Sequence, residues 1–223
     1  MSREVSASAR RITDALLDGY GRTYAAEAGI RLRDTPQPLY QLLVLSHLLS
    51  ARIRASVAVS AARALFADGM RTPRRMADAT WQQRVDALGE GGYRRYDERT
   101  STQLGEGAQL VLDVWKGDLR RLRAEADGDG EVVRAGLRRV QGIGPAGADI
   151  FVREVQNLWP ETGFWVGAKG VQGAERLGLP ASPDTLAVVA RGRDRAAFAA
   201  ALVRAALDRE VAETVREAAR ART

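Results

Sequence analysis

The chain has 223 residues, no cysteine, one histidine and a formal net charge of +6 at pH 7. The lack of cysteine excludes disulfide-held scaffolds, cysteine-ligated metal sites and iron–sulfur clusters, and the single histidine excludes a histidine-rich zinc site. Only two of the 34 basic residues are lysines, and the planar fork of arginine suits phosphates and base edges, so nucleic acid is a candidate partner, with codon bias as the alternative explanation.

Apolar residues recur at spacings of three and four through most of the chain, and no segment shows a run of alternating β-branched residues, which predicts an all-α fold. The segment 39–51 is apolar nearly all round and is expected at the centre of the core. The predicted helices cover 5–28, 39–51, 55–66, 93–115, 132–140 and 145–158, with shorter helices after Thr72 and Thr80, at 169–177 and 184–191, and between 194 and 221.

The sequence shows neither an export signal nor a membrane span. Residues 2–11 carry charges without an apolar stretch of the required length. The most apolar run, 39–49, contains Gln41, Ser46 and His47 and is too short to cross a bilayer. We therefore expect a cytoplasmic protein with no membrane partner.

A glycine turn, Gly142-Ile143-Gly144, separates two of the predicted helices. Two glycines around one apolar residue allow a tight turn in which Ile143 enters the core and the amides that start the next helix point outward. Such a helix start binds phosphate through its N–H groups and its dipole. The arginines that precede the turn, with no acidic residue between positions 132 and 148, are Arg134, Arg138 and Arg139. The turn is thus predicted to bind an anion.

With this turn, the chain resembles the endonuclease III superfamily of helix-hairpin-helix DNA glycosylases. The segment 42–52, Leu-Leu-Val-Leu-Ser-His-Leu-Leu-Ser-Ala-Arg, is similar to the family's central helix. Thr72-Pro73, Gly92-Tyr93 and the segment 166–179 resemble later landmarks in the right order. The resemblance covers about residues 38–179 and implies two helical lobes flanking a DNA-binding cleft. One would be a six-helix lobe at 38–158 that contains the hairpin, and the other would be formed by 1–37 and 159–223.

The resemblance also implies a base-excision DNA repair protein whose partner is damaged double-stranded DNA, and which is nucleoid-associated when bound. We expect a monomer. Arg52 stands where the family has a glutamine wedge that fills the gap left by a flipped base, and the alternative is an arginine that caps its helix. The residues expected to bind DNA are Arg52, Arg138, Arg139, Gly142, Ile143, Gly144, Ala146 and Lys169.

Three departures from the family pattern concern its chemistry. Ala146 stands where bifunctional members carry a Schiff-base lysine, so covalent attack by this residue is excluded. Gly167 stands where the family has an aspartate that stabilises positive charge on the sugar, when Arg176-Leu177-Gly178 sets the register. The cysteines of the family's iron–sulfur cluster are missing, so we expect no cofactor, with a monovalent cation at the hairpin left open.

Three residues are candidates for the missing catalytic groups. His47 lies five residues before Arg52, the offset of the catalytic glutamate in the family's adenine-mismatch branch. A histidine there suits protonation of a leaving base near neutral pH, and the alternative is a hydrogen-bonded core histidine. Asp149 and Glu161 are the carboxylate candidates, with pairing to arginine as the alternative for Asp149. The expected pocket residues are Ser46 and Ser50, which share a face with His47, and Trp165, which is suited to stacking on an extruded base unless it belongs to the core.

Three functions follow from these residues. The first, which we favour, is a DNA glycosylase of the monofunctional type that flips a damaged base and hydrolyses its N-glycosidic bond with activated water, without a Schiff-base lysine. The second is a catalytically silent module of the same fold that binds DNA lesions. The third is a helical protein whose glycine hairpin has no DNA role.

Overall fold

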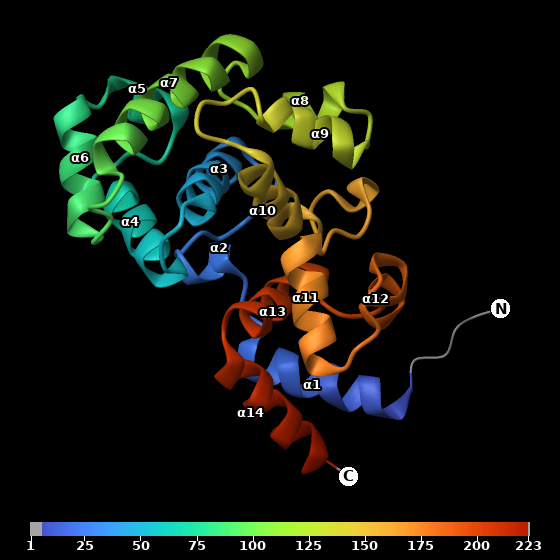
Figure 1. Ribbon diagram of the computed structural model, residues 1–223. Helices are drawn as coiled ribbons and strands as arrows, with labels where there is room; N and C mark the ends of the chain where they lie inside the picture. Colours follow the sequence, from blue (N-terminus) through green and yellow to red (C-terminus); the bar gives the residue numbers. More distant parts are fainter. Residues whose placement is uncertain (1–5, 223) are drawn as a thin grey trace. The chain divides into compact units, whose positions relative to one another are not determined.

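The computed structural model describes residues 6–222, and within this range the chain forms helices and no strand, which confirms the all-α prediction. The predicted start of the first helix, at residue 5, lies outside the described residues. Figure 1 shows the helices in chain order. They are α1 (Ala7–Tyr20), α2 (Tyr24–Glu27), α3 (Pro36–Ser50), α4 (Ala55–Ala67), α5 (Pro73–Asp78), α6 (Trp81–Glu90), α7 (Asp97–Trp115), α8 (Arg120–Glu125), α9 (Gly130–Leu137), α10 (Pro145–Val155), the 3₁₀ helix η1 (Pro160–Thr162), α11 (Gly167–Leu177), α12 (Pro183–Val189), α13 (Arg195–Leu207) and α14 (Arg209–Arg220).

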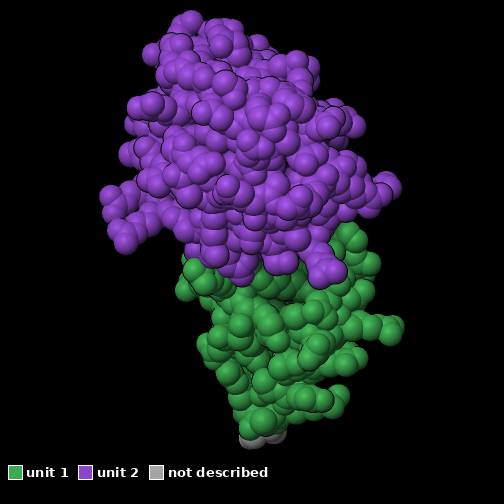
Figure 2. Space-filling model, turned by 90° about the vertical axis from the view of Figure 1, so that its left-hand side faces the viewer, with its two compact units in different colours: residues 1–23, 153–223 green, residues 24–152 purple. Residues whose placement is uncertain are grey.

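The chain divides into two compact units, coloured separately in Figure 2. The central unit is Tyr24–Val152, and the terminal unit combines the chain up to Thr23 with the chain from Arg153 onward. These boundaries differ from the predicted ones at 38 and 158, because α2 and the connection before α3 group with the central unit. The boundary at 152 falls inside α10, so this helix belongs to both units.

Two helix boundaries differ from the predicted ones by the most residues. The helix predicted at 5–28 is interrupted after Tyr20, where Gly21 ends α1 with its amide bonded to the Leu17 carbonyl at 2.8 Å. The helix predicted from residue 93 begins only at Asp97, because the chain from Gly91 to Tyr96 turns to bring Tyr93 into the core, where it is 2% exposed. In both cases the local turn decides where the helix starts or stops.

Helix α3 forms the buried centre of the central unit, as its apolar sequence predicts. Its residues Leu39, Leu42, Leu45 and Leu48 are fully buried. Pro36 occupies the first turn, where a missing N–H costs no hydrogen bond. Because α3 is enclosed, it reaches solvent mainly at its two ends. Residues at and beside these ends can therefore contact a ligand.

A buried arginine joins three helices of the central unit. Arg84 on α6 is 8% exposed, and its guanidinium donates to the carbonyl oxygens of Ser101 at 2.8 Å, Met76 at 3.0 Å and Ala79 at 2.6 Å. Burial lowers the pKa of this guanidinium, and the neighbouring Tyr40 opposes that shift. The three acceptors lie on α5, just after α5 and on α7, so Arg84 holds these segments around α6.

The terminal unit has its own core. Helices α1, α11, α13 and α14 pack together around side chains such as Leu16, Phe198 and Leu202, all fully buried. Helices α11 and α13 pack closely at Gly173, where a Cβ would overlap the Leu202 carbonyl. No helix within residues 6–222 is both long enough and apolar enough to cross a membrane.

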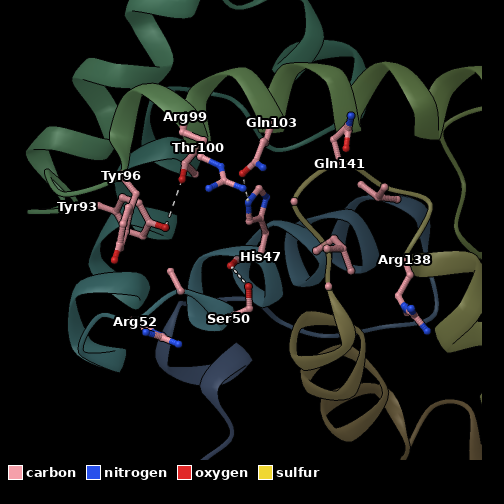
Figure 3. Close-up of a pocket in the computed structure, with 15 residues that line it drawn as sticks. His47, Ser50, Arg52, Tyr93, Tyr96, Arg99, Thr100, Gln103, Arg138 and Gln141 are labelled. Carbon is pink, nitrogen blue, oxygen red and sulfur yellow. Dashed lines mark hydrogen bonds between the residues drawn. The ribbon is translucent and has the colours of Figure 1, made fainter.

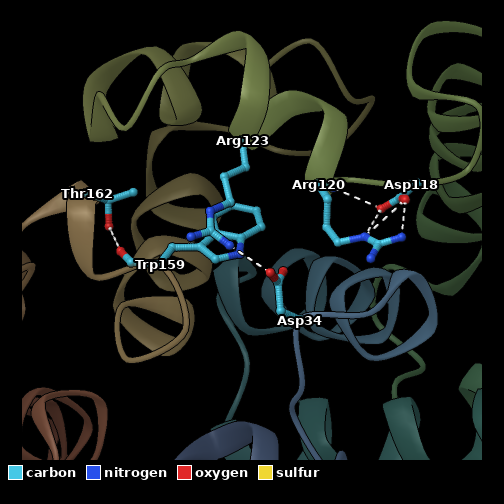
Figure 4. A network of polar contacts seen from close by, with 6 residues as sticks. All are labelled: Asp34, Asp118, Arg120, Arg123, Trp159 and Thr162. Carbon is cyan, nitrogen blue, oxygen red and sulfur yellow. Dashed lines mark hydrogen bonds and ion pairs between the residues drawn. The ribbon is translucent and has the colours of Figure 1, made fainter.

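Partly exposed polar contacts fasten the loops of each unit (Figure 4). In the central unit, Arg123 on α8 pairs with Asp34 at 2.7 Å, and Arg120 pairs with Asp118 at 2.7 Å. In the terminal unit, the Thr162 hydroxyl donates to the Trp159 carbonyl at 2.7 Å and closes the turn of η1. Pairs this exposed contribute roughly 0–1 kcal/mol each, so they position the loops more than they stabilise the fold.

Candidate nucleic-acid interface

The glycine hairpin joins α9 to α10 in the central unit. Asp129 caps α9, its carboxylate accepting from the amides of Glu131 and Val132. The hairpin is anchored by buried apolar side chains on both sides of the turn, and Ile143 is 4% exposed, as predicted. Gly142 has a φ of +83°, a region that favours glycine, so the turn depends on this residue. The buried anchors are Val133, Leu137, Val140, Ile143, Ala148 and Phe151.

His47 lies directly against the hairpin. A Cβ built on Gly142 would overlap the His47 ring, so only glycine leaves room for this imidazole. His47 Nε2 is 3.2 Å from Gln103 Oε1 and donates to it when the proton is on Nε2. Burial lowers the pKa of His47 from 6.5 to about 4, with Arg99 adding to the shift and the bond to Gln103 opposing it. The imidazole is therefore neutral at neutral pH, and its catalytic role stays a prediction.

This depressed pKa predicts an acid-sensitive fold. The unfolded chain takes up a proton on His47 near pH 6.5, whereas the folded chain does so only near pH 4. The neutral His47 therefore contributes to the free energy of unfolding above the unfolded pKa, and this contribution is lost as the pH falls from 6.5 towards 4. The expected loss in the free energy of unfolding is about 2 kcal/mol between neutral pH and about pH 4.5. Urea unfolding at the two pH values measures it. The His47→Gln variant is the control, and an equal loss of stability in both proteins would contradict the assignment.

A cavity of about 670 Å³ opens beside His47, between the end of α3, the start of α7 and the hairpin (Figure 3). Figure 3 shows Arg99 and Gln103 reaching from α7 toward His47. Among the described residues that line this cavity, three are arginines and none is an aspartate or glutamate. The lining side chains and glycines include His47, Ser50, Arg52, Tyr93, Tyr96, Arg99, Thr100, Gln103, Arg138, Gln141, Ile143, Gly142 and Gly144. The cavity is thus suited to an anion with several hydrogen-bond acceptors.

The structure brings seven of the predicted site residues to this cavity from distant parts of the sequence. They are His47, Ser50, Arg52, Arg138, Gly142, Ile143 and Gly144. Arg52 is exposed just after α3, and Arg138 is exposed at the end of α9. The Ser50 hydroxyl donates to the His47 carbonyl at 2.7 Å, which orders the last turn of α3.

Other predicted residues of the central unit do not line the cavity. Ser46 is fully buried and its hydroxyl donates to the Leu42 carbonyl at 2.8 Å, so it serves the helix itself. Arg139 lies over the Trp115 ring, 5.6 Å from its centroid. Ala146 is exposed in the first turn of α10. Ser46, Arg139 and Ala146 are therefore not among the residues that face the cavity.

The predicted carboxylate Asp149 is paired with an arginine. Its Oδ1 lies 2.6 Å from Arg134 Nη2, and the same guanidinium contacts Glu131 at 2.5 Å. Asp149 is thus paired with an arginine, which is the alternative considered for it from the sequence. The two carboxylates also neutralise Arg134, so this arginine adds little to the positive charge expected at the hairpin. Of the three arginines that precede the turn, Arg138 is the one that faces the cavity.

The remaining predicted residues belong to the terminal unit. Glu161 is exposed in η1, and Trp165 is partly buried, with its amide donating to Gln156 Oε1 at 3.0 Å. Lys169 is exposed on α11 and its ammonium donates to Gln172 at 3.0 Å. Their catalytic, pocket and DNA-binding roles stay predictions.

Sequence reasoning missed the residues that α7 and the preceding turn contribute. Arg99 and Gln103 are four residues apart on α7, and Tyr93 and Tyr96 precede them. The spacing of 96, 99, 100 and 103 places these side chains on one helical face, a signal present in the sequence. Their convergence on His47 depends on how α7 packs, which a single sequence does not reveal.

Acidic and histidine side chains do not gather into a metal-binding group anywhere within residues 6–222. The monovalent cation considered for the hairpin remains a prediction.

Comparison with known proteins supports the fold assignment. No protein-family model matches the chain, and neither does any curated protein. A solved structure described as a trapped endonuclease III–DNA covalent intermediate, in an estranged-adenine complex, is similar to it. The two are 15% identical and superpose with a TM-score of 0.52, over 87% of this chain and 83% of that chain. The fold is therefore that of the helix-hairpin-helix DNA glycosylases, as the sequence predicts.

Proposed function

We propose that this protein binds damaged double-stranded DNA through the cavity beside the hairpin and recognises the lesion by taking up an extruded nucleotide. The observation that carries the proposal is the convergence of Arg52, Arg99 and Arg138 on one cavity whose described lining contains no carboxylate. The fold supports it, because the endonuclease III of the similar structure was solved with DNA.

Each part of the cavity has a place in this proposal. Arg138 and the first amides of α10 are suited to backbone phosphates, which supply most of the affinity for DNA. Arg52 stands at the exposed end of α3, where it fills the gap that an extruded base leaves. Tyr96 provides an aromatic side chain in the wall beside Arg99. The Ile143 plug and the Gly142 turn hold the hairpin in place.

Lesion binding without hydrolysis agrees better with this geometry than catalysis does. Cleavage of the N-glycosidic bond places positive charge on the sugar, and three arginines disfavour that charge unless DNA phosphates neutralise them. His47 is neutral at neutral pH, and Asp149 is held by Arg134. A catalytically silent DNA-lesion-binding module is therefore the function that the geometry supports best.

Hydrolysis is the second candidate, and the glycosylase fold favours it. In this version the protein is a monofunctional-type DNA repair enzyme that flips a damaged base and hydrolyses its N-glycosidic bond with water. Ala146 supplies no amine, so no Schiff-base adduct forms there. Glu161, exposed in η1, is then the carboxylate that we expect to activate the water. Both candidates act as a monomer on DNA in the cytoplasm and need no cofactor.

The Arg52→Glu/Arg138→Glu double variant tests the binding proposal. We expect its affinity for a duplex that contains an abasic-site analogue to fall about 100-fold, because the phosphate contact of Arg138 becomes repulsive and the Arg52 side chain that fills the gap is replaced by an acid that the DNA phosphates repel. Fluorescence anisotropy at fixed salt measures the loss. The matched control is Arg74→Glu/Arg121→Glu, which reverses the same number of charges at exposed positions outside the cavity. An equal loss in the control would show that net charge alone is responsible.

The same titrations separate the two candidate functions. Duplexes with uracil, oxidised, alkylated and abasic lesions are incubated with excess protein, and released base is measured. The silent module predicts lesion-preferring binding and no release. Release that Glu161→Gln abolishes would establish the hydrolase, and a borohydride-trapped adduct lost in Lys169→Ala would contradict both versions.

A further inference from the structure

A second basic cavity lies at the opposite end of α3. It measures about 410 Å³ and shares no lining residue with the cavity beside the hairpin. Gln37, Pro38 and Gln41 from the first turns of α3 line it, whereas the first cavity lies at the last turn of that helix. With a rise of about 1.5 Å per residue, the 15 residues of α3 separate the two cavities by roughly 20 Å.

Backbone carbonyls hold two of its three arginines in place. Arg63 on α4 donates through Nη2 to the Glu27 carbonyl, and Arg71 Nε donates to the Phe66 carbonyl at 2.6 Å. A guanidinium has five donors, so a bond to one carbonyl leaves further N–H groups that can bind a ligand. Arg31 is the third, and it is exposed. Held arginines lose little freedom on binding, which favours recognition of an anion.

The charge around this cavity favours an anion as well. Its described lining contains three arginines and no aspartate or glutamate. A neighbouring cavity contains Asp68, Asp78 and Asp86 and shares Arg71 with this one. Arg31 and Arg63 do not line that neighbouring cavity, so they carry the excess positive charge of the site.

The rest of the lining is apolar or carries amides. Phe66 is 5% exposed and lies beside Pro38, Ala28 and Ala67, while Gln37 and Gln41 add carboxamide groups. The volume is larger than a phosphate ion requires. An apolar wall next to a cationic one fits a ligand with a phosphate at one end and a sugar or base at the other.

We infer that this cavity is a second binding site, for the phosphate group of a nucleotide. The phosphate contacts Arg31, Arg63 and Arg71, and the sugar or base packs on the apolar wall at Pro38 and Ala67. The nucleotide comes either free or as part of a nucleic-acid strand. The inference does not rest on DNA binding at the hairpin, because the two cavities have no lining residue in common.

The experiment follows the arginine Nε–Hε signals of the full chain by ¹H–¹⁵N NMR during titration with dAMP. We expect saturable shifts at Arg31, Arg63 and Arg71, and about tenfold weaker binding in Arg31→Glu, whose side chain makes no hydrogen bond within the described structure. Deoxyadenosine, which lacks the phosphate, is expected to cause no such shifts. Titration with a short thymidine oligonucleotide shows whether the ligand is a free nucleotide or part of a strand. If the oligonucleotide binds more tightly than dAMP, the ligand is a strand, and if it binds more weakly, the ligand is a free nucleotide.

Two controls make the result decisive. Arg74→Glu removes the same charge from an exposed position outside both cavities and is expected to leave dAMP binding unchanged. The Arg52→Glu/Arg138→Glu variant is expected to keep dAMP binding here even where its duplex binding is lost. The inference is wrong if dAMP shifts none of the three arginines, if Arg74→Glu weakens binding as much as Arg31→Glu, or if inorganic phosphate binds as tightly as dAMP.

Discussion

Replacing Gly142 with alanine is expected to lower the free energy of unfolding by about 3 kcal/mol and the affinity for lesion-containing duplex DNA at least about tenfold. A φ of +83° costs an alanine roughly 1 kcal/mol. The new methyl group also overlaps the His47 ring, so His47 must move and its bond to Gln103 is lost. Urea unfolding and anisotropy on the same preparation measure the two effects.

Gly144 provides the matched control. A Cβ at Gly144 meets nothing within 4 Å, and its φ lies outside the left-handed region. Gly144→Ala should therefore change the free energy of unfolding by no more than about 0.5 kcal/mol. If the two alanine variants are equally stable, the contact between His47 and Gly142 does not determine the hairpin.

Replacing Arg84 with methionine is expected to lower the free energy of unfolding by about 4 kcal/mol. The variant leaves two buried carbonyls and one partly buried carbonyl without their donor, at roughly 1–3 kcal/mol each, partly offset because a buried charge is also removed. Arg84→Lys keeps the charge, but an ammonium group has no planar fork that reaches three acceptors. Its free energy of unfolding should therefore lie between those of the parent and of Arg84→Met. Chemical denaturation at neutral pH measures both.

The control for Arg84 is Arg74→Met, since Arg74 is exposed on α5 in the same unit. It should change stability by no more than about 0.5 kcal/mol. Equal stability of Arg84→Met and the parent would mean that desolvation of the guanidinium cancels its three hydrogen bonds.

The fold was accessible from the sequence because its signals are local. The apolar character of 39–51 predicted the buried α3, and the periodicity elsewhere predicted helices without a strand. What the sequence did not reveal were the starts and stops that tertiary packing decides. The late start of α7 depends on the burial of Tyr93, a contact that helix propensity does not include.

The site was accessible only in part, for a related reason. The hairpin glycines, Arg52 and His47 were found because they lie within continuous motifs. Gly142 and Gly144 have the same local sequence signal, and the His47 ring distinguishes them. Partners far along the chain were also hidden, such as Trp115 for Arg139 and Gln103 for His47. Side chains that look alike in a motif therefore differ in role through contacts made by other elements.

The nested order of the two units sets a sequence of folding events during synthesis. Helix α1 packs against α13 and α14, which are made about 190 residues later, after the whole central unit. The central unit can thus complete its core on the ribosome while α1 still exposes the apolar face that carries Leu16. Until α13 and α14 emerge, most of the native partners of that face are missing, so the newly made chain is most exposed to aggregation and to chaperones before these two helices are made.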